Sequence, residues 1–332
     1  MRRKKLVSAH REYDLGNYRK ALDICESIYL EDSSYVDNLL LLGAIHFQFR
    51  NFSESLFFLR QCIRVKPNLA EAFSNIGNCL KELNDINSAI SFFNKAIRHQ
   101  PRVSEFYTNL ATAEFQNGNV SKAIDTFEIA LSIKSNNLVD AHNNLGIVLK
   151  TTGELDEAKK HFIEAVKIDP KCAIAWSSLG TVFYQQKEIN SAIESFEQAL
   201  KVEPKFCDAY SNLGNAFYEE GTIHKDKDAI SKALTSFQKA IGLRPEFATA
   251  YGNLGVCYYE QGDYDNCCKL LHKAIYLEPS YADALNNLGC TYMKLGNLEN
   301  GIQYFLQAIE IRADHVHALN NLGIAIRNKV RF

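Results

Sequence analysis

An asparagine returns at one position of a sequence pattern that runs along most of the chain. The pattern reads Asn-Leu-Gly or a close variant, and its asparagines are Asn75, Asn109, Asn144, Asn212, Asn253, Asn287 and Asn321. Each side-chain amide offers a hydrogen-bond donor and an acceptor, which match the N–H and C=O groups of a peptide backbone. If the seven amides lie on one face, we expect them to bind extended polypeptide through its main chain. The alternative is that they only join neighbouring repeats by hydrogen bonds.

Acidic residues stand four positions before five of these asparagines, which places both residue types on one face of a helix. They are Glu71, Glu105, Asp140, Asp208 and Asp283. Here too an alternative stays open, because an acidic residue near the start of a helix also interacts favourably with the helix dipole. No lysine or arginine occupies this position. That absence weighs against a clamp for a terminal carboxylate, which needs basic residues.

No arrangement of residues in the sequence predicts catalysis. The chain has no Gly-x-Ser-x-Gly or His-Glu-x-x-His motif, and its glycines are not arranged as a phosphate-binding loop. His315 and His317 are two positions apart and would point to different sides of a helix. We therefore predict no catalytic residue, no metal site and no cofactor.

The spacing of the asparagine pattern indicates which elements must position these side chains. With Ser178 counted as the fourth position, successive positions are 34 or 35 residues apart, except for one step of 41 after Asn212. A period of 34 is typical of tetratricopeptide repeats, each of which is a pair of helices that stacks on its neighbours. In this fold the first helix of each repeat lines the concave groove. Extending the register backwards places Leu41 and Val7 in the asparagine position, so the first two repeats are degenerate.

We predict an all-α fold in which one tetratricopeptide-repeat solenoid spans residues 1–332. It contains nine full repeats and half of a tenth. The expected repeats cover approximately residues 2–35, 36–69, 70–103, 104–138, 139–172, 173–206, 207–247, 248–281 and 282–315, with a partial repeat at 316–332.

Glycine and proline positions predict where the helices pack and end. All six prolines fall near the end of a second helix, which they would terminate. Mid-helix glycines such as Gly77 and Gly214 would let two helices approach closely, and Phe93 and its equivalents on the second helices are expected in the core. A second set of glycines is expected to end the first helix and form the turn: Gly16, Gly118, Gly153, Gly221, Gly262 and Gly296. Seven extra residues after Gly221 predict a charged protruding turn or an extended hairpin tip.

The composition argues against several classes of function. A net charge of −2 gives no electrostatic signature of nucleic-acid binding. No apolar run approaches the roughly 20 residues of a transmembrane helix, and the basic start lacks the apolar stretch of a secretory signal. Nine cysteines never form a Cys-x-x-Cys pair, which favours reduced, mostly buried thiols. We therefore expect a cytoplasmic or nuclear protein that binds neither nucleic acid nor membrane.

Several segments resemble the amino-terminal repeats of the O-linked N-acetylglucosamine transferases: "AHREYDLGNY", "LLLLGAIHFQFRNFSES", "NLAEAFSNIGNCLKE" and "AIAWSSLGTVFYQQKEINSAIESFEQALKVEP". The resemblance covers most of the chain. It implies a right-handed superhelix that guides protein substrates towards a glycosyltransferase domain. It also implies that the seven asparagines form a ladder, with acidic groove contacts at Asp140, Asp208 and Asp283. Ser178, Leu41 and the insertion after Gly221 depart from the regular pattern.

Two functions follow as hypotheses. The first is the substrate-recognition part of a protein glycosyltransferase, whose catalytic part would follow the repeats and is absent from this chain. The second is a stand-alone scaffold of an intracellular complex. The final segment offers apolar residues such as Leu319 and Ile326 without a partner helix, which favours a truncated chain over a capping helix. Both hypotheses predict protein or peptide ligands in the concave groove, and both leave a homodimer open.

Overall fold

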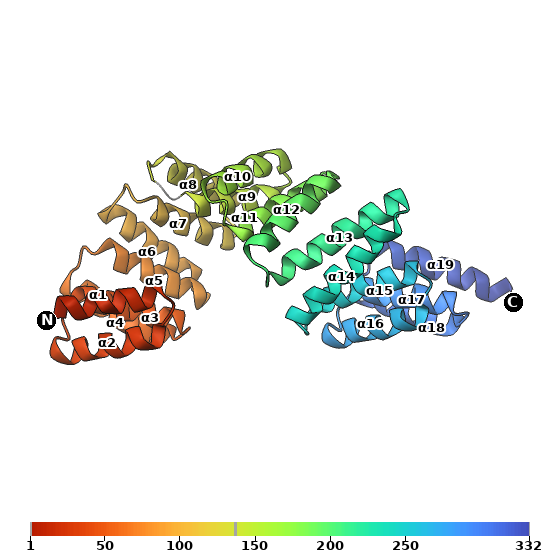
Figure 1. The fold of residues 1–332 in the computed structure, drawn as a ribbon, viewed down its shortest axis with the longest axis horizontal. Helices are drawn as coiled ribbons and strands as arrows, with labels where there is room; N and C mark the ends of the chain where they lie inside the picture. Colours follow the sequence, from red (N-terminus) through yellow and green to blue (C-terminus); the bar gives the residue numbers. More distant parts are fainter. Residues whose placement is uncertain (1, 136–137, 332) are drawn as a thin grey trace. The chain divides into compact units, whose positions relative to one another are not determined.

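The computed structural model describes residues 2–135 and 138–331, and these residues form nineteen α-helices without a strand (Figure 1). The helices pair into hairpins as the 34-residue period predicts, so the all-α tetratricopeptide fold is confirmed. The chain divides into two compact units, residues 1–169 and 170–332. The expectation of one uninterrupted solenoid stays a prediction.

The first unit contains five hairpins. Their helices are α1 (Arg2–Asp14), α2 (Tyr18–Glu31), α3 (Val36–Gln48), α4 (Phe52–Val65), α5 (Ala70–Glu82), α6 (Ile86–His99), α7 (Ser104–Gln116), α8 (Val120–Ser132), α9 (Val139–Thr152) and α10 (Leu155–Ile168). Part of the link between the fourth and fifth predicted repeats lies outside the described residues.

The second unit contains four hairpins and a final helix. Its helices are α11 (Ala173–Gln185), α12 (Ile189–Val202), α13 (Cys207–His224), α14 (Lys227–Leu243), α15 (Ala248–Glu260), α16 (Tyr264–Leu277), α17 (Ala282–Lys294), α18 (Leu298–Ile311) and α19 (Val316–Arg331). The apolar residues Leu319, Ile324 and Ile326 of α19 are exposed, as the sequence predicts.

The odd-numbered helices are the first helices of the repeats, and within each unit they pack against one another. Contacts join α3 to α5, α5 to α7 and α7 to α9, and likewise α13 to α15 and α15 to α17. Among the described residues of each unit, the backbones of second helices do not approach one another in this way, and they meet only through side chains, as where the ring of Tyr29 on α2 packs against that of Phe58 on α4. The first helices are therefore the more closely spaced layer. The face that they share is called the first-helix face below.

Each hairpin is closed by a buried side chain of the second helix that packs on a small residue of the first. Phe93 of α6 is fully buried, and its Cε1 lies 2.5 Å from the position that a Cβ on Gly77 would occupy. The same arrangement joins Gly214 of α13 to Phe237 of α14. The predicted reason for the mid-helix glycines is confirmed, because a methyl group there would overlap the ring.

The turn glycines behave as predicted at five of six positions. Gly16, Gly118, Gly153, Gly262 and Gly296 all have positive φ angles between 77° and 90°. The prediction for Gly221 was wrong. Gly221 is buried inside α13, where a Cβ would lie 2.6 Å from Ile230 Cδ1, and the helix continues to His224.

The seven extra residues after Gly221 lengthen both helices of their hairpin. Helix α13 has 18 residues and α14 has 17, and Lys225 makes the turn in the left-handed conformation with φ 54°. The extended hairpin tip is thus confirmed. Gly221 is buried because the longer α14 now packs along it.

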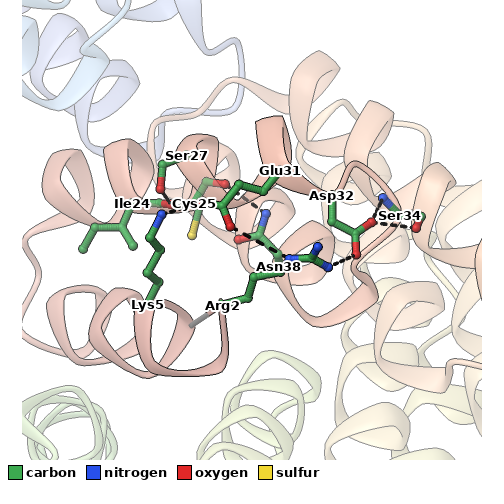
Figure 2. Close-up of polar contacts among 9 residues, drawn as sticks. All are labelled: Arg2, Lys5, Ile24, Cys25, Ser27, Glu31, Asp32, Ser34 and Asn38. Atoms are coloured by element: carbon green, nitrogen blue, oxygen red, sulfur yellow. Dashed lines mark hydrogen bonds and ion pairs between the residues drawn. The ribbon is translucent and has the colours of Figure 1, made fainter.

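Polar contacts hold the degenerate first hairpin together (Figure 2). Arg2 of α1 bonds to Asp32 at 2.7 Å, and Lys5 bonds to Glu31 of α2 at 2.6 Å. The buried Asn38 of α3 donates from Nδ2 to the carbonyl of Cys25 at 3.0 Å, which ties the second hairpin to the first.

The described chain has nine free cysteines, and six of them are buried. Cys257 is fully buried, and burial raises the pKa of its thiol to about 12. The interpretation of the cysteines as mostly small buried residues is confirmed by this burial.

Candidate peptide-binding face

All seven predicted asparagines lie on first helices and are half-buried. Asn75, Asn109 and Asn144 lie on α5, α7 and α9 of the first unit. The four asparagines of the second unit lie on α13, α15, α17 and α19: Asn212, Asn253, Asn287 and Asn321. Ser178 holds the equivalent position on α11 and is also half-buried.

Four of the asparagines form hydrogen bonds to the preceding first helix. In the first unit, Nδ2 of Asn109 donates to Ser74 Oγ at 3.3 Å, and Nδ2 of Asn144 donates to Thr112 Oγ1 at 3.5 Å. In the second unit, Nδ2 of Asn253 donates to Oδ1 of Asn215 at 2.8 Å. Likewise, Nδ2 of Asn321 donates to Oδ1 of Asn286 at 2.9 Å.

The acceptors of these bonds occupy two equivalent places on the preceding helix. They stand one position before the asparagine of that helix, as Ser74 does, or three positions after it, as Thr112 does. Those places are four residues apart and share one helical face. Inter-repeat bonding is therefore one role of these asparagines. Further bonds engage some of the same amides: Oδ1 of Asn144 and of Asn287 each accepts a long bond from the preceding asparagine, at 3.4 and 3.3 Å, and Nδ2 of Asn321 also donates to Cys290 Sγ at 3.2 Å.

Clefts on the first-helix face bring several candidate residues together. Asn109, Asn144 and Asp140 line one cleft of about 580 Å³ between α5, α7 and α9. Asn75 lines a second cleft of about 430 Å³, which spans α1, α3, α5 and α7. In the second unit, Asn287 lines a smaller cleft of about 150 Å³.

The acidic candidates of the second unit are engaged in ion pairs. Asp208 accepts two hydrogen bonds of 3.0 Å from Arg244, at the end of α14, and this contact raises the pKa of the arginine. Asp283 accepts from Arg312 Nη2 at 2.8 Å and lies 3.1 Å from His315 Nε2. About half of each carboxylate side chain is nevertheless exposed, so neither aspartate is sealed from solvent.

Sequence reasoning missed the cations that border the acidic positions. Arg244 and Arg312 come from the ends of second helices, and Arg102 and Lys134 occupy comparable places in the cleft that contains Asp140. A signal was available, because several cations stand beside the proline that ends a second helix, as Arg102 follows Pro101. Lys81 of α5 is the cation that a first helix itself adds to this cleft.

Within residues 2–135 and 138–331, no group of three or more histidine, cysteine, aspartate or glutamate side chains is placed to hold a metal ion. No helix in the part of the chain that the structure describes is long and apolar enough to cross a bilayer.

Comparison with known sequences assigns the family. Models of the tetratricopeptide repeat match residues 75–137, 139–172 and 282–315, and a model described as a TPR repeat matches 180–221, 221–262 and 257–296. These segments together make up more than half of the chain. The chain belongs to the tetratricopeptide-repeat family.

Two curated relatives are similar over shorter stretches. A UDP-N-acetylglucosamine–peptide N-acetylglucosaminyltransferase of Caenorhabditis elegans is 38% identical over 81 residues, which are 24% of this chain and 7% of the transferase. The probable transferase SEC of Arabidopsis thaliana is 34% identical over 85 residues, which are 26% of this chain and 9% of that protein. The resemblance to the transferase repeats is confirmed to this extent, and the matches span less than a tenth of either transferase.

A solved structure supports the fold over a longer range. A chain from the crystal structure of the APC/C hetero-tetramer Cut9–Hcn1 has a TM-score of 0.67, and the match covers 92% of this chain and 58% of that chain. The sequence identity is 19%. This likeness concerns the fold alone.

Proposed function

We propose that this protein is an interaction module whose first-helix face binds extended polypeptide. The binding element would be the row of seven repeated asparagines on the first helices, which is called the asparagine column. The observation that supports the proposal best is that the column opens into clefts rather than lying inside the packed core. Asn75, Asn109 and Asn144 all line such clefts, and each side chain is half-buried. A half-buried amide is held in place by its surroundings and can still bond to a ligand.

Main-chain binding follows from the chemistry of the side chain. An extended peptide presents N–H and C=O groups about every 3.3 Å, and an amide can donate to one and accept from the other. Neighbouring first helices lie about 10 Å apart in such packing. Successive asparagines would therefore meet about every third residue of the peptide and would distinguish little of its sequence.

The similarity to the N-acetylglucosaminyltransferases supports a more specific proposal. In this view the repeats are the substrate-recognition region of a UDP-GlcNAc:protein transferase, and the acidic groups Asp140, Asp208 and Asp283 add contacts to the substrate. The competing proposal of a stand-alone scaffold predicts the same groove. The mass of the native protein, by immunoblot with antibodies against these repeats, separates the two, since the transferase requires a band far above 37.6 kDa.

The free cysteines bear on where the protein works. None of the nine is in a disulfide in the described chain, and reduced thiols are typical of the cytosol and nucleus. We place the protein in one or both of these compartments.

Peptide binding is tested by removing the amides of the first unit. A display library of random 12-residue peptides is selected on the 332-residue protein, and the best fluorescein-labelled peptide is titrated by fluorescence anisotropy. The test variant replaces Asn75, Asn109 and Asn144 with alanine. The control replaces Asn87 and Asn94 of the second helix α6.

Each lost neutral hydrogen bond is worth about 1 kcal/mol, so the test variant should bind about 100-fold more weakly. The control should bind as the wild type does. Circular dichroism checks that both variants remain helical. Equal affinity of the folded test variant and the wild type would refute the asparagine column as the binding element.

A further inference from the structure

Two clefts of the first unit, those lined by Asn75 and by Asn109, differ in charge. The first, called the acidic cleft, has an apolar floor that includes Leu40 and Phe106, and it is bordered by four carboxylates: Asp14, Asp37, Glu71 and Glu105. Neither lysine nor arginine is among the residues that line it. It therefore fits a ligand side chain that combines a long apolar stem with a positive charge.

Glu71 gives the acidic cleft an unmatched charge. Its Oε1 accepts a long bond of 3.4 Å from Gln100. Its Oε2 is buried and has no hydrogen-bond partner among the described residues. A buried carboxylate oxygen without a donor is costly, and a ligand cation in the cleft would offset that cost through its charge without having to reach the buried atom.

The second cleft, called the cationic cleft, carries Lys81, Arg102 and Lys134 together with the carboxylates of Glu105 and Asp140. Lys81 is half-buried on α5, and burial lowers the pKa of its amine. A partly desolvated ammonium gains more from an incoming carboxylate than an exposed one does.

The two clefts adjoin at Glu105. Glu105 lines both of them, and both lie on first helices of the same unit. The acidic cleft centres on α3 and α5, and the cationic cleft centres on α7 and α9. Two helix spacings of about 10 Å separate these centres, which equals about six residues of extended chain. Asn75 and Asn109 lie along the path between them.

We infer that the first unit selects peptides with separated opposite charges, with a lysine or arginine in the acidic cleft and an aspartate or glutamate about six residues away in the cationic cleft. This inference rests on the proposed function, because the asparagines hold the main chain while the clefts choose the side chains. It adds a charge pattern as the recognised feature of a groove that otherwise binds any backbone.

Three fluorescein-labelled synthetic dodecapeptides of identical composition test the inference against the 332-residue protein. One has two lysines followed six residues later by two aspartates, the second has the reverse order, and the third alternates the four charges at its centre. Each exposed charge pair contributes only modestly, so the four charges of a peptide must act together. One of the two separated-charge peptides should therefore bind about tenfold more tightly than the alternating peptide.

Charge-neutral variants locate the effect. Asp37→Asn with Glu71→Gln, or Lys81→Gln with Lys134→Gln, should each reduce the tenfold preference to below threefold. The control, Glu197→Gln with Lys201→Gln on the second helix α12, should leave it unchanged. The preference should also shrink in 0.5 M salt, because screening acts on the partly exposed charges.

The outcomes separate this inference from the proposed function. Equal affinity for all three peptides, combined with weaker binding after replacement of Asn75, Asn109 and Asn144, overturns the charge pattern and leaves the asparagine column standing. A charge preference that persists after these asparagine replacements, with the affinity for every peptide unchanged, supports the inference and overturns the column. A preference that survives both cleft variants shows that the charges are read elsewhere and overturns the inference.

Discussion

Gly77 should be intolerant of even one added methyl group. It lies on α5 against Phe93 of α6, and a Cβ built on Gly77 would lie 2.5 Å from Cε1 and 2.8 Å from Cδ1 and Cζ of that ring. Carbon atoms in contact normally stand about 3.5–4.0 Å apart. Gly77→Ala therefore requires a displacement of about 1 Å between the helices or of the ring.

The magnitude follows from two opposing terms. Overpacking a core costs about 1–3 kcal/mol, and the full burial of Phe93 places this site in the upper part of that range. Replacing a mid-helix glycine with alanine gains about 1 kcal/mol in helix propensity. We expect a net destabilisation of about 1–2 kcal/mol, which lowers the unfolding midpoint by about 2–6 °C.

Gly242 provides a matched control. It lies in α14, is exposed, and a Cβ there would have no atom within 4 Å. Gly242→Ala should show only the propensity term and should raise the stability. The two substitutions are chemically identical and are expected to have opposite signs.

Thermal and urea unfolding followed by far-UV circular dichroism measure both variants. Repeat arrays can unfold in more than one step, so the whole curve is compared rather than one midpoint alone. Ala111 occupies the equivalent position over Phe127, which shows that one hairpin accommodates the methyl group. If Gly77→Ala stabilises the protein as much as Gly242→Ala does, the close-packing explanation of the repeated glycines is wrong.

Two further predictions concern polar pairs within the hairpins of the first unit. His142 and His161 place their Nδ1 atoms 3.0 Å apart, and burial lowers the pKa of both imidazoles. The neutral pair should stabilise the fold above about pH 6.5, the pKa of an unfolded histidine, and this contribution should be lost as the pH falls. The thermal midpoint should thus drop more between pH 7 and pH 5 in the wild type than in His161→Gln, and parallel pH profiles would contradict the assignment. Thr126 donates to Oε2 of the fully buried Glu114 at 2.7 Å. Thr126→Val should therefore cost about 1–3 kcal/mol in urea unfolding, whereas Thr126→Ser should retain most of the stability, and equal losses in both variants would argue against the hydrogen bond.

The repeat pattern in the sequence was sufficient to predict the hairpins and their cores. A 34-residue period forces each asparagine into the same place on a first helix, and each phenylalanine, such as Phe93, into the same place on a second helix. Periodicity and proline positions act through local helix geometry. They therefore predicted the helix pairs and the buried side without knowledge of distant contacts.

The prediction that Gly221 ends its helix was wrong for a reason that lies in the tertiary structure. Elsewhere the register alone predicts the turn, because the second helix begins a fixed distance after the glycine. In this hairpin the insertion lengthened both helices, and Ile230 of the longer α14 packs against Gly221 within α13. Whether extra residues form a loop or extend two helices depends on whether the added turns can pack together. Packing of that kind is not visible in either helix alone.

Tertiary packing also decided which side chains meet at the candidate site. The sequence determined that the asparagines share a face, because their spacing matches the repeat. Only the tertiary structure showed that Asn109 bonds to Ser74 and that Arg244 pairs with Asp208, since these partners are 35 and 36 residues apart in the chain. A side chain's neighbours across a repeat boundary depend on how one hairpin stacks on the next. Stacking brings the ends of second helices, with cations such as Arg244 and Arg312, beside the acidic positions of the first helices.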